Sequence, residues 1–180
     1  MIVPLTHSLV RQVAESMRAA DRRELFATRR DEDPAAIAAE LMATSALGAV
    51  VASRRKPFAA VAVICGREMW PGVWSMGLFA TDRWPEVVIE TYRYLTRELG
   101  PELRRLGAHR LECHSLAEHA SAHRLLARLG AVREAEVPGF GRRGEDFVRY
   151  AWVEPVSEHS TVSSEQDVFR QQFSGAAAAA

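Results

Sequence analysis

Apolar residues recur every three to four positions in several segments, and this spacing predicts helices. One such segment is 7–18, where Leu9, Val10, Val13 and Met17 fall on one face. A short helical turn is expected over 21–27, and a longer helix from Pro34, because Asp33-Pro34 joins a capping residue to a proline at the first helical position. Further helices are predicted over 85–99 and 117–129. Gly100-Pro101 should break the former, and Gly130 should end the latter as a left-handed cap.

Short runs of small and β-branched residues between these segments predict strands. They cover 2–5, 49–52, 58–64, 73–80, 109–115, 131–137 and 147–153. Pro4 places the first strand at a sheet edge, and the sparse polar content of 73–80 predicts burial on both faces. Mixed order of helices and strands predicts an α/β or α+β domain, in which helices flank a mixed central sheet.

The chain divides into a compact unit and a tail. Residues 1–154 carry all the regular patterns, whereas 155–180 are rich in Ser, Thr, Glu and His and end in five alanines. Such a tail does not bury enough apolar surface alone, so a partner, a symmetry mate or the domain's own groove would have to order it. Its apolar residues are the expected partner-binding contacts, namely Val168, Phe169 and Phe173.

Charge and composition exclude some classes of protein. Lys plus Arg and Asp plus Glu both number 23 in the 180 residues, and a zero net charge argues against a protein that coats nucleic acid. No apolar run approaches the roughly 20 residues that span a bilayer, and the N-terminus lacks signal-peptide features. The two cysteines, Cys65 and Cys113, are expected to be reduced thiols inside a soluble, intracellular protein.

Several segments resemble the GNAT N-acetyltransferase superfamily. They are the strand 74–80 running into a helix at Pro85, the strand 109–115 followed by a helix ending in Leu129-Gly130, and the closing strands that end at Trp152. The stretch 18–25, with Arg18, Asp21 and Glu24 three apart, is similar to the Arg-x-x-Asp-x-x-Glu start of many members. The resemblance implies a GNAT-like fold over the domain.

Three segments, 79–87, 111–113 and 139–146, look more narrowly like a phage-encoded branch of that superfamily. This branch includes a small internal virion or morphogenesis protein of short-tailed phages. The narrower resemblance implies location in a virion or the host cytoplasm. It also implies contacts with other virion or assembly proteins, through the tail or through a homo-oligomer.

Members of the superfamily bind the diphosphate of acetyl-CoA on a Gly-rich turn after the central strand, where backbone N–H groups meet the anion. The matching turn here is Thr81-Asp82-Arg83-Trp84-Pro85-Glu86 and has no glycine. Pro85 removes one N–H donor, and the acids Asp82, Glu86 and Glu90 place negative charge where the phosphates would lie. Either this is an acid-capped helix start without a cofactor, or it is an atypical phosphate site in which Arg83 compensates.

The family's general acid is often a Tyr on the helix before the Leu-Gly end, a position that Leu126 occupies here. His119 and His123 are the nearest candidates for proton transfer, and both are expected to be partly exposed. With Cys113 and His114 they also suggest a metal site. Ala120 stands where a metalloprotease motif needs Glu, so we expect no metal.

Three functions remain open from the sequence. The first is a GNAT-fold phage virion or assembly protein without classical acetyltransferase activity and without a cofactor. The alternative is an acetyl-CoA-dependent N-acyltransferase with an atypical diphosphate turn, and a third is an acyl-CoA sensor without turnover.

Overall fold

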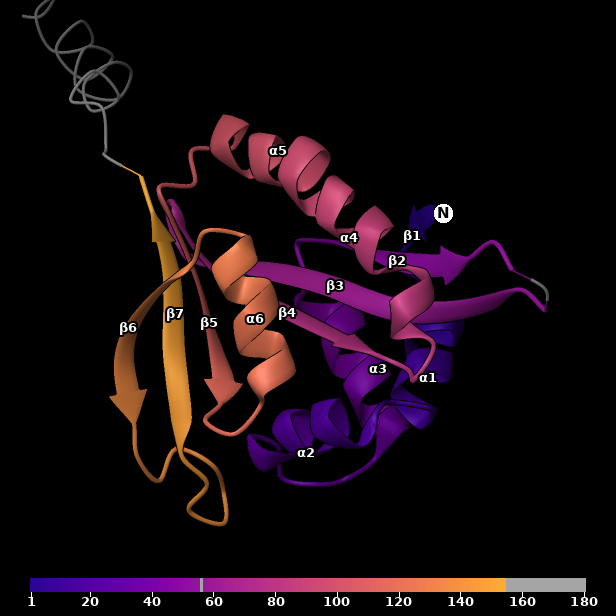
Figure 1. The fold of residues 1–180 in the computed structure, drawn as a ribbon, viewed down its shortest axis with the longest axis horizontal. Coiled ribbons are helices and arrows are strands. Elements are labelled where there is room, and N and C mark those ends of the chain that lie inside the picture. The colour runs from indigo at the N-terminus through magenta and orange to yellow at the C-terminus, as the bar shows by residue number, and fades with distance from the viewer. Residues whose placement is uncertain (56, 155–180) are drawn as a thin grey trace, which may run out of the picture.

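One seven-stranded mixed sheet forms the centre of the molecule (Figure 1). The computed structural model describes residues 1–55 and 57–154. The strands lie in the order β1-β2-β3-β4-β5-β7-β6, and every neighbouring pair is antiparallel except β4 and β5. Their bounds are β1 Ile2–Pro4, β2 Leu47–Ser53, β3 Ala59–Trp70, β4 Val73–Ala80, β5 Arg110–Leu116, β6 Val132–Val137 and β7 Phe147–Val153.

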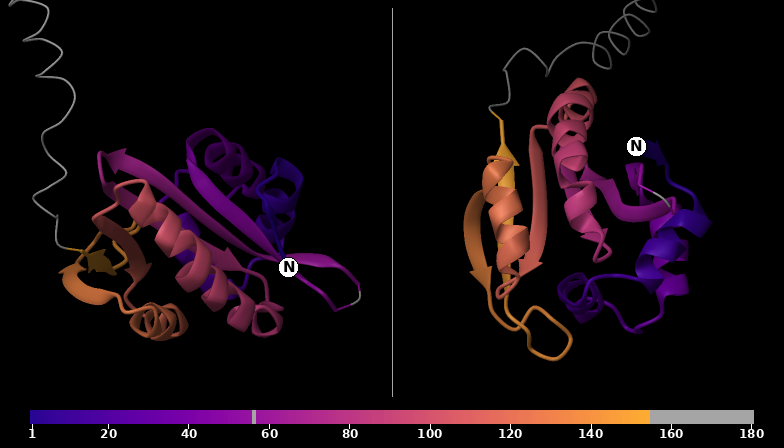
Figure 2. Two further views of the ribbon diagram at one scale, coloured as in Figure 1. Left: turned by 90° about the horizontal axis from the view of Figure 1, so that it is seen from above. Right: turned by 45° about the vertical axis from the view of Figure 1, so that its right-hand side comes forward.

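Helices cover both faces of this sheet (Figure 2). On one face lie α1 (His7–Glu15), α2 (Ala19–Ala27) and α3 (Pro34–Thr44). On the other face lie α6 (Ala120–Arg128) and a continuous helical stretch after β4. This stretch consists of η1 (Trp84–Glu86), α4 (Val88–Tyr94), η2 (Leu95–Leu99) and α5 (Gly100–Arg105). No helix among residues 1–55 and 57–154 is long and apolar enough to cross a membrane.

Successive residues of the central strands alternate between two apolar cores, since strand side chains have a period of two. In β2, Val50 packs with α1 and α3, whereas Val51 packs with the helical stretch after β4. Both valines are fully buried, as are Val61 and Val63 of β3. This double burial explains why the strands in the middle of the sheet read as nearly continuous apolar runs.

Most predicted elements are confirmed, and so is the predicted class of a mixed sheet flanked by helices. The strands 73–80 and 147–153 have the predicted bounds, β1 with Pro4 is an edge strand, Asp33 caps α3, and Gly130 has a positive φ of 81°. The division at residue 154 stays a prediction. Val168, Phe169 and Phe173 lie outside the described residues.

Two predictions about the helices and strands were wrong. Gly100-Pro101 does not break the helix, because the turn Leu95–Leu99 is a π-helix in which the Gly100 N–H donates to the Leu95 carbonyl. The wider turn rearranges the hydrogen bonds around the donor that Pro101 lacks, so the helical stretch continues to Arg105. In β4 only the end residues are buried; Ser75 to Leu78 are partly exposed, because they line cavities on both faces.

Candidate functional site

The two central strands, β4 and β5, separate from each other along their length. They pair in parallel only from Val73 to Ser75 against Arg110 to Glu112. Beyond these pairs β4 continues to Ala80 and β5 to Leu116 without pairing with each other, which leaves a V-shaped opening between them (Figure 1). The helical stretch after β4 and the helix after β5 flank this opening on one face, and α2 lies on the other.

Side chains from α2 close the wide end of the opening on the β4 side. Asp21 accepts a hydrogen bond from the Ala80 N–H at 2.6 Å, and the Arg18 N–H donates to the Ala80 carbonyl at 2.9 Å. Arg18 also holds Asp21 with Nη2 2.7 Å from Oδ1 and Nε 3.0 Å from Oδ2. The edge of β4 at Ala80 that faces away from β3 is therefore already hydrogen-bonded, and it does not offer these groups to an extended ligand.

Glu24 makes the equivalent connection to β5. Its Oε2 atom accepts from the Ser115 hydroxyl and from the Leu116 N–H, both at 2.7 Å. His119, the residue before α6, lies between the two acids: Nδ1 is 2.9 Å from Glu24 Oε2, and Nε2 is 3.3 Å from Asp21 Oδ1. One acid–histidine–acid cluster thus joins α2 to the ends of both separated strands.

His119 was predicted to be partly exposed, and this was wrong, since only 5% of it is exposed. Burial lowers its pKa, but the Asp21 and Glu24 carboxylates beside the ring, of which Glu24 is hydrogen-bonded to Nδ1, raise the pKa to about 9. The ring is therefore a charged imidazolium at neutral pH. It holds its proton too tightly to be a general base there, and it acts as a structural cation between two carboxylates.

His123 is a different kind of histidine. It is half-buried, its ring centroid lies 5.3 Å from that of Tyr150, and burial lowers its pKa. Its Nε2 atom is buried and has no hydrogen-bond partner among the described residues. His119 and His123 thus differ in their partners and in the direction in which their pKa is shifted. Within residues 1–55 and 57–154, no group of three or more potential ligands is arranged around a metal position.

The turn between β4 and α4 spans Thr81 to Val87. The Arg83 N–H donates to the Thr81 hydroxyl at 3.3 Å, and the Trp84 N–H donates to the Thr81 carbonyl at 3.0 Å. The N–H groups of Glu86 and Val87 donate to carbonyls inside the same turn, at 2.9 and 3.0 Å. Pro85 has no N–H group. Four of the donors that would meet a diphosphate are thus directed at the turn itself.

Arg83 is engaged as well. Its Nε and Nη2 atoms bind the two oxygens of Glu86 at 3.1 and 2.9 Å, and its Nη1 atom donates to the Pro57 carbonyl at 3.1 Å. Hydrogen bonds from Arg83 and from the Ser53 hydroxyl lower the pKa of Glu86 to about 2, so this carboxylate is ionised at neutral pH. Asp82 is exposed, and Arg18 lies over the ring of Trp84. As folded, the turn does not fit the diphosphate of acetyl-CoA.

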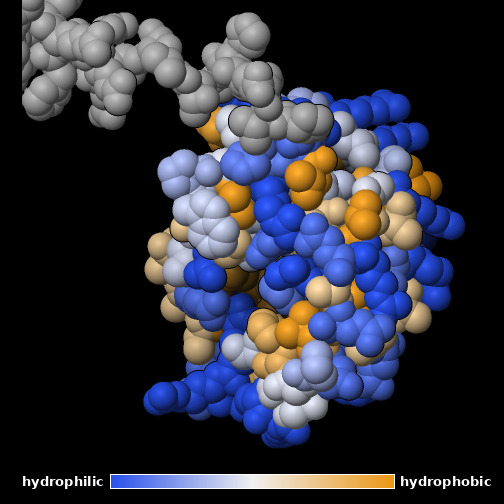
Figure 3. All heavy atoms as spheres, turned by 90° about the vertical axis from the view of Figure 1, so that its left-hand side faces the viewer, coloured by the Kyte–Doolittle hydropathy of each residue, from blue (hydrophilic) through white to orange (hydrophobic). Residues whose placement is uncertain are grey.

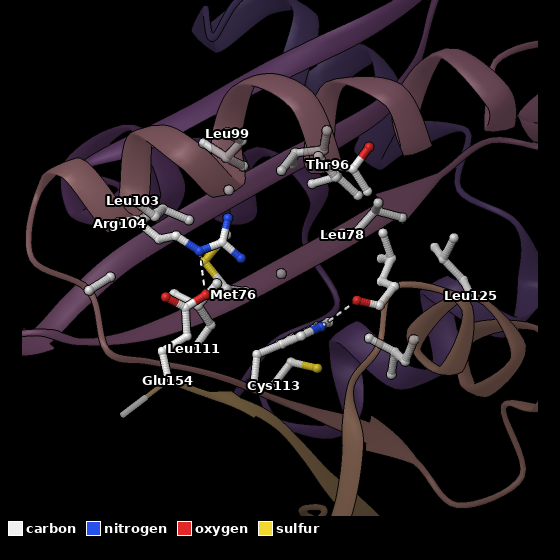
Figure 4. A pocket seen from close by; sticks show the side chains of 18 of the residues that line it. Met76, Leu78, Thr96, Leu99, Leu103, Arg104, Leu111, Cys113, Leu125 and Glu154 are labelled. Atoms are coloured by element: carbon white, nitrogen blue, oxygen red, sulfur yellow. Dashed lines mark hydrogen bonds and ion pairs between the residues drawn. The ribbon is translucent and has the colours of Figure 1, made fainter. Parts of the chain in front are cut away.

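An apolar cavity of about 290 Å³ lies between the helical stretch after β4 and α6. We call it the helix-pair cavity. Figure 4 shows Leu99 and Leu103 projecting into it from the helix, Leu111 and Cys113 from β5, and Leu125 from α6. Leu126 also lines it. The position that carries a tyrosine in many GNAT enzymes is therefore part of an apolar wall.

A second cavity, of about 560 Å³, lies on the opposite face beside α2 and α3. We call it the opposite-face cavity. Its lining is more polar and includes Glu24, Arg67 and His114, whose ring stacks on Phe140 with centroids 4.8 Å apart. Cys113 lines one cavity and His114 the other, as expected for neighbours on a strand.

Three residues line both cavities, namely Met76, Gly77 and Leu78 of β4. They lie just beyond the last paired residue, Ser75, where the strands separate. The Thr81 N–H donates to β3, so by strand alternation the peptide groups of Leu78 face the opening toward β5. The two cavities thus adjoin each other at the opening.

Sequence comparison identifies no relative: no protein-family model matches the chain, and no curated protein matches it. Comparison of folds is more informative. The ribosomal-protein-S18-alanine N-acetyltransferase from Escherichia coli superimposes with a TM-score of 0.64 over 91% of this chain and 99% of that one, at 15% identity. The ribosomal-protein-S5-alanine acetyltransferase from Vibrio fischeri gives a TM-score of 0.60 over 85% and 92%, at 14% identity.

A GNAT-family acetyltransferase from Bacillus anthracis is similar in the same way, with a TM-score of 0.57 over 84% of this chain and 93% of that one, at 16% identity. TM-scores of this size establish a shared fold, whereas identities this low leave the activity open. The chain therefore has the GNAT N-acetyltransferase fold.

Proposed function

We propose that this protein uses the GNAT fold for binding other proteins and does not transfer acyl groups from acetyl-CoA. The role that suits its segments 79–87, 111–113 and 139–146 is that of a phage virion or assembly component, located in the particle or the host cytoplasm. One observation carries the proposal: the N–H groups of Arg83, Trp84, Glu86 and Val87, together with the Arg83 side chain, are already bonded within the protein.

A diphosphate on this turn would compete with bonds that the protein already makes. A diphosphate on this turn would have to take Arg83 from Glu86, and it would then lie beside an ionised carboxylate that repels it. Freeing the amides of Trp84 or Val87 would unfold the turn that starts the helix. Each exchange breaks existing bonds to form new ones, so the net gain in binding free energy is small.

Proton transfer faces a similar obstacle. Leu126 has no ionisable group, His119 is held as a cation by Asp21 and Glu24, and His123 is half-buried with a lowered pKa. These features support a non-catalytic role. They would not weaken binding of another protein chain.

The first test is titration calorimetry with acetyl-CoA and with CoA, together with an assay for release of the CoA thiol. We expect no binding at millimolar ligand and no thiol release. Micromolar binding with turnover, lost in Arg83→Ala but kept in the control Arg11→Ala, whose exposed side chain pairs with Glu15 on α1, would overturn the proposal. Mass spectrometry of purified particles tests the assembly role, and absence of the protein from particles and assembly intermediates would refute it.

A second candidate is an N-acyltransferase with an atypical diphosphate turn. The observation that favours it is the meeting of the helix-pair and opposite-face cavities beside Leu78, which resembles a passage between a donor and an acceptor. The same calorimetry separates the two candidates, because the enzyme requires the thioester to bind and the assembly protein does not.

A further inference from the structure

The helix-pair cavity has apolar walls that nothing among the described residues covers. Figure 3, which looks at the side of the molecule that carries β6 and β7, shows a hollow with apolar walls bordered by polar residues. We propose that this cavity receives the chain's own C-terminal segment, with Val168, Phe169 and Phe173 docking into it. The proposal does not depend on the proposed function.

The starting point of the tail supports this assignment. Strand β7 ends at Val153, and the next residue, Glu154, belongs to the cavity lining. Glu154 pairs with Arg104 of α5 at the rim (Figure 4). The last described residue before the segment 155–180 therefore lies at the mouth of the cavity.

The length of the tail permits the contact. Val168 is 14 residues beyond Glu154 (168 − 154), and a chain of this length reaches up to about 46 Å when extended, at about 3.3 Å per residue. A tether this short keeps the tail at a high effective concentration near the cavity, so a weak contact suffices to hold it there.

The chemistry also matches. Phe169 and Phe173 are four residues apart, which places both rings on one face of a helix, while Arg170, Gln171 and Gln172 lie between them. Leu99, Leu103 and Leu125 line a groove between two helices, and an amphipathic helix laid in an apolar groove is a common mode of recognition. A partner that binds the tail would then have to displace it from its own domain.

The native cysteines provide a test in the full-length chain. Cys113 lines the helix-pair cavity, whereas Cys65 lines the opposite-face cavity and serves as an internal control. We would measure the rate at which N-ethylmaleimide modifies each thiol, by peptide mass spectrometry. Replacing both rings, in Phe169→Asp/Phe173→Asp, should speed modification of Cys113 about tenfold, which corresponds to docking favoured by about 1.4 kcal/mol. The Cys65 rate should not change.

A matched variant, Ser163→Asp/Ser164→Asp, adds the same charge to the tail without touching the apolar residues and should modify at the wild-type rate. Equal Cys113 rates in all three proteins would overturn the proposal. Protection of Cys113 that grows with protein concentration would also overturn it, because the occupant would then be the tail of a second copy.

Discussion

The buried cluster of His119, Asp21 and Glu24 predicts how the stability of this protein depends on pH. The folded state holds the His119 proton with a pKa of about 9, against an ordinary value of 6.5. Because the folded value is the higher one, the contribution to stability is complete below pH 6.5. It is lost as pH rises through 9, where the folded protein also releases the proton.

The size of the effect follows from the shift. A difference of about 2.5 pKa units, at about 1.36 kcal/mol per unit, gives about 3 kcal/mol. The conversion suits this group because only 4% of its side chain is exposed. A loss of that size is a large part of the 5–15 kcal/mol that stabilises a typical domain.

The assay is urea unfolding at several pH values from 6 to 10, on the wild type and on His119→Gln. The unfolding free energy of the wild type should fall toward that of the variant by about 3 kcal/mol between about pH 6 and 9.5. Burial raises the pKa of the Cys65 and Cys113 thiols to about 11 and 12, so both proteins lose further stability above pH 9. That loss cancels in the comparison. A difference between the two proteins that stays constant with pH would refute the reasoning.

Three further predictions concern the fold. Phe79→Ala should cost about 3–5 kcal/mol in chemical denaturation, because Phe79 is 2% exposed in the core beneath α1 and α3; a loss under 1 kcal/mol would mean that this core is loosely packed. Asp33→Ala should cost about 1 kcal/mol, because the Asp33 carboxylate accepts the Ala35 N–H at 2.9 Å, and Asp33→Asn, which keeps an acceptor, should cost much less. Gly48→Ala should lower the thermal midpoint, because its Cβ would lie 2.5 Å from the Ile64 carbonyl oxygen and from Leu5 Cδ1; an unchanged midpoint would contradict this packing.

Local sequence signals identified the candidate turn but did not show whether its donors already have hydrogen-bond partners. The absence of glycine from 81–86 and the presence of Pro85 were visible in the sequence. The sequence did not show that Ser53 and Arg83 both bond to Glu86. Ser53 is 33 residues away from Glu86 along the chain, and it reaches the turn only through the pairing of β2, β3 and β4. Whether the turn has free donors for an anion depends on these hydrogen bonds, which join distant segments of the chain.

The role of Arg18, Asp21 and Glu24 was missed for the same reason. Their spacing of three was a signal that they share a helix face, but their partners, Ala80, Leu116 and His119, lie 59 to 98 residues away. From the sequence alone, a histidine at the start of a helix is expected to be partly exposed. Only the meeting of three elements buries it between two acids.

By itself, the sequence determined the elements and their order, because hydrophobic spacing, helix caps and strand composition act over a few neighbouring residues. Tertiary structure alone decided which groups are free. The separation of β4 from β5 opens two cavities, while α2 and the hairpin of β2 and β3 supply the partners that occupy the strand ends and the turn. A side chain or amide can bind a ligand only when the fold has not already given it a partner, and that depends on contacts between distant segments.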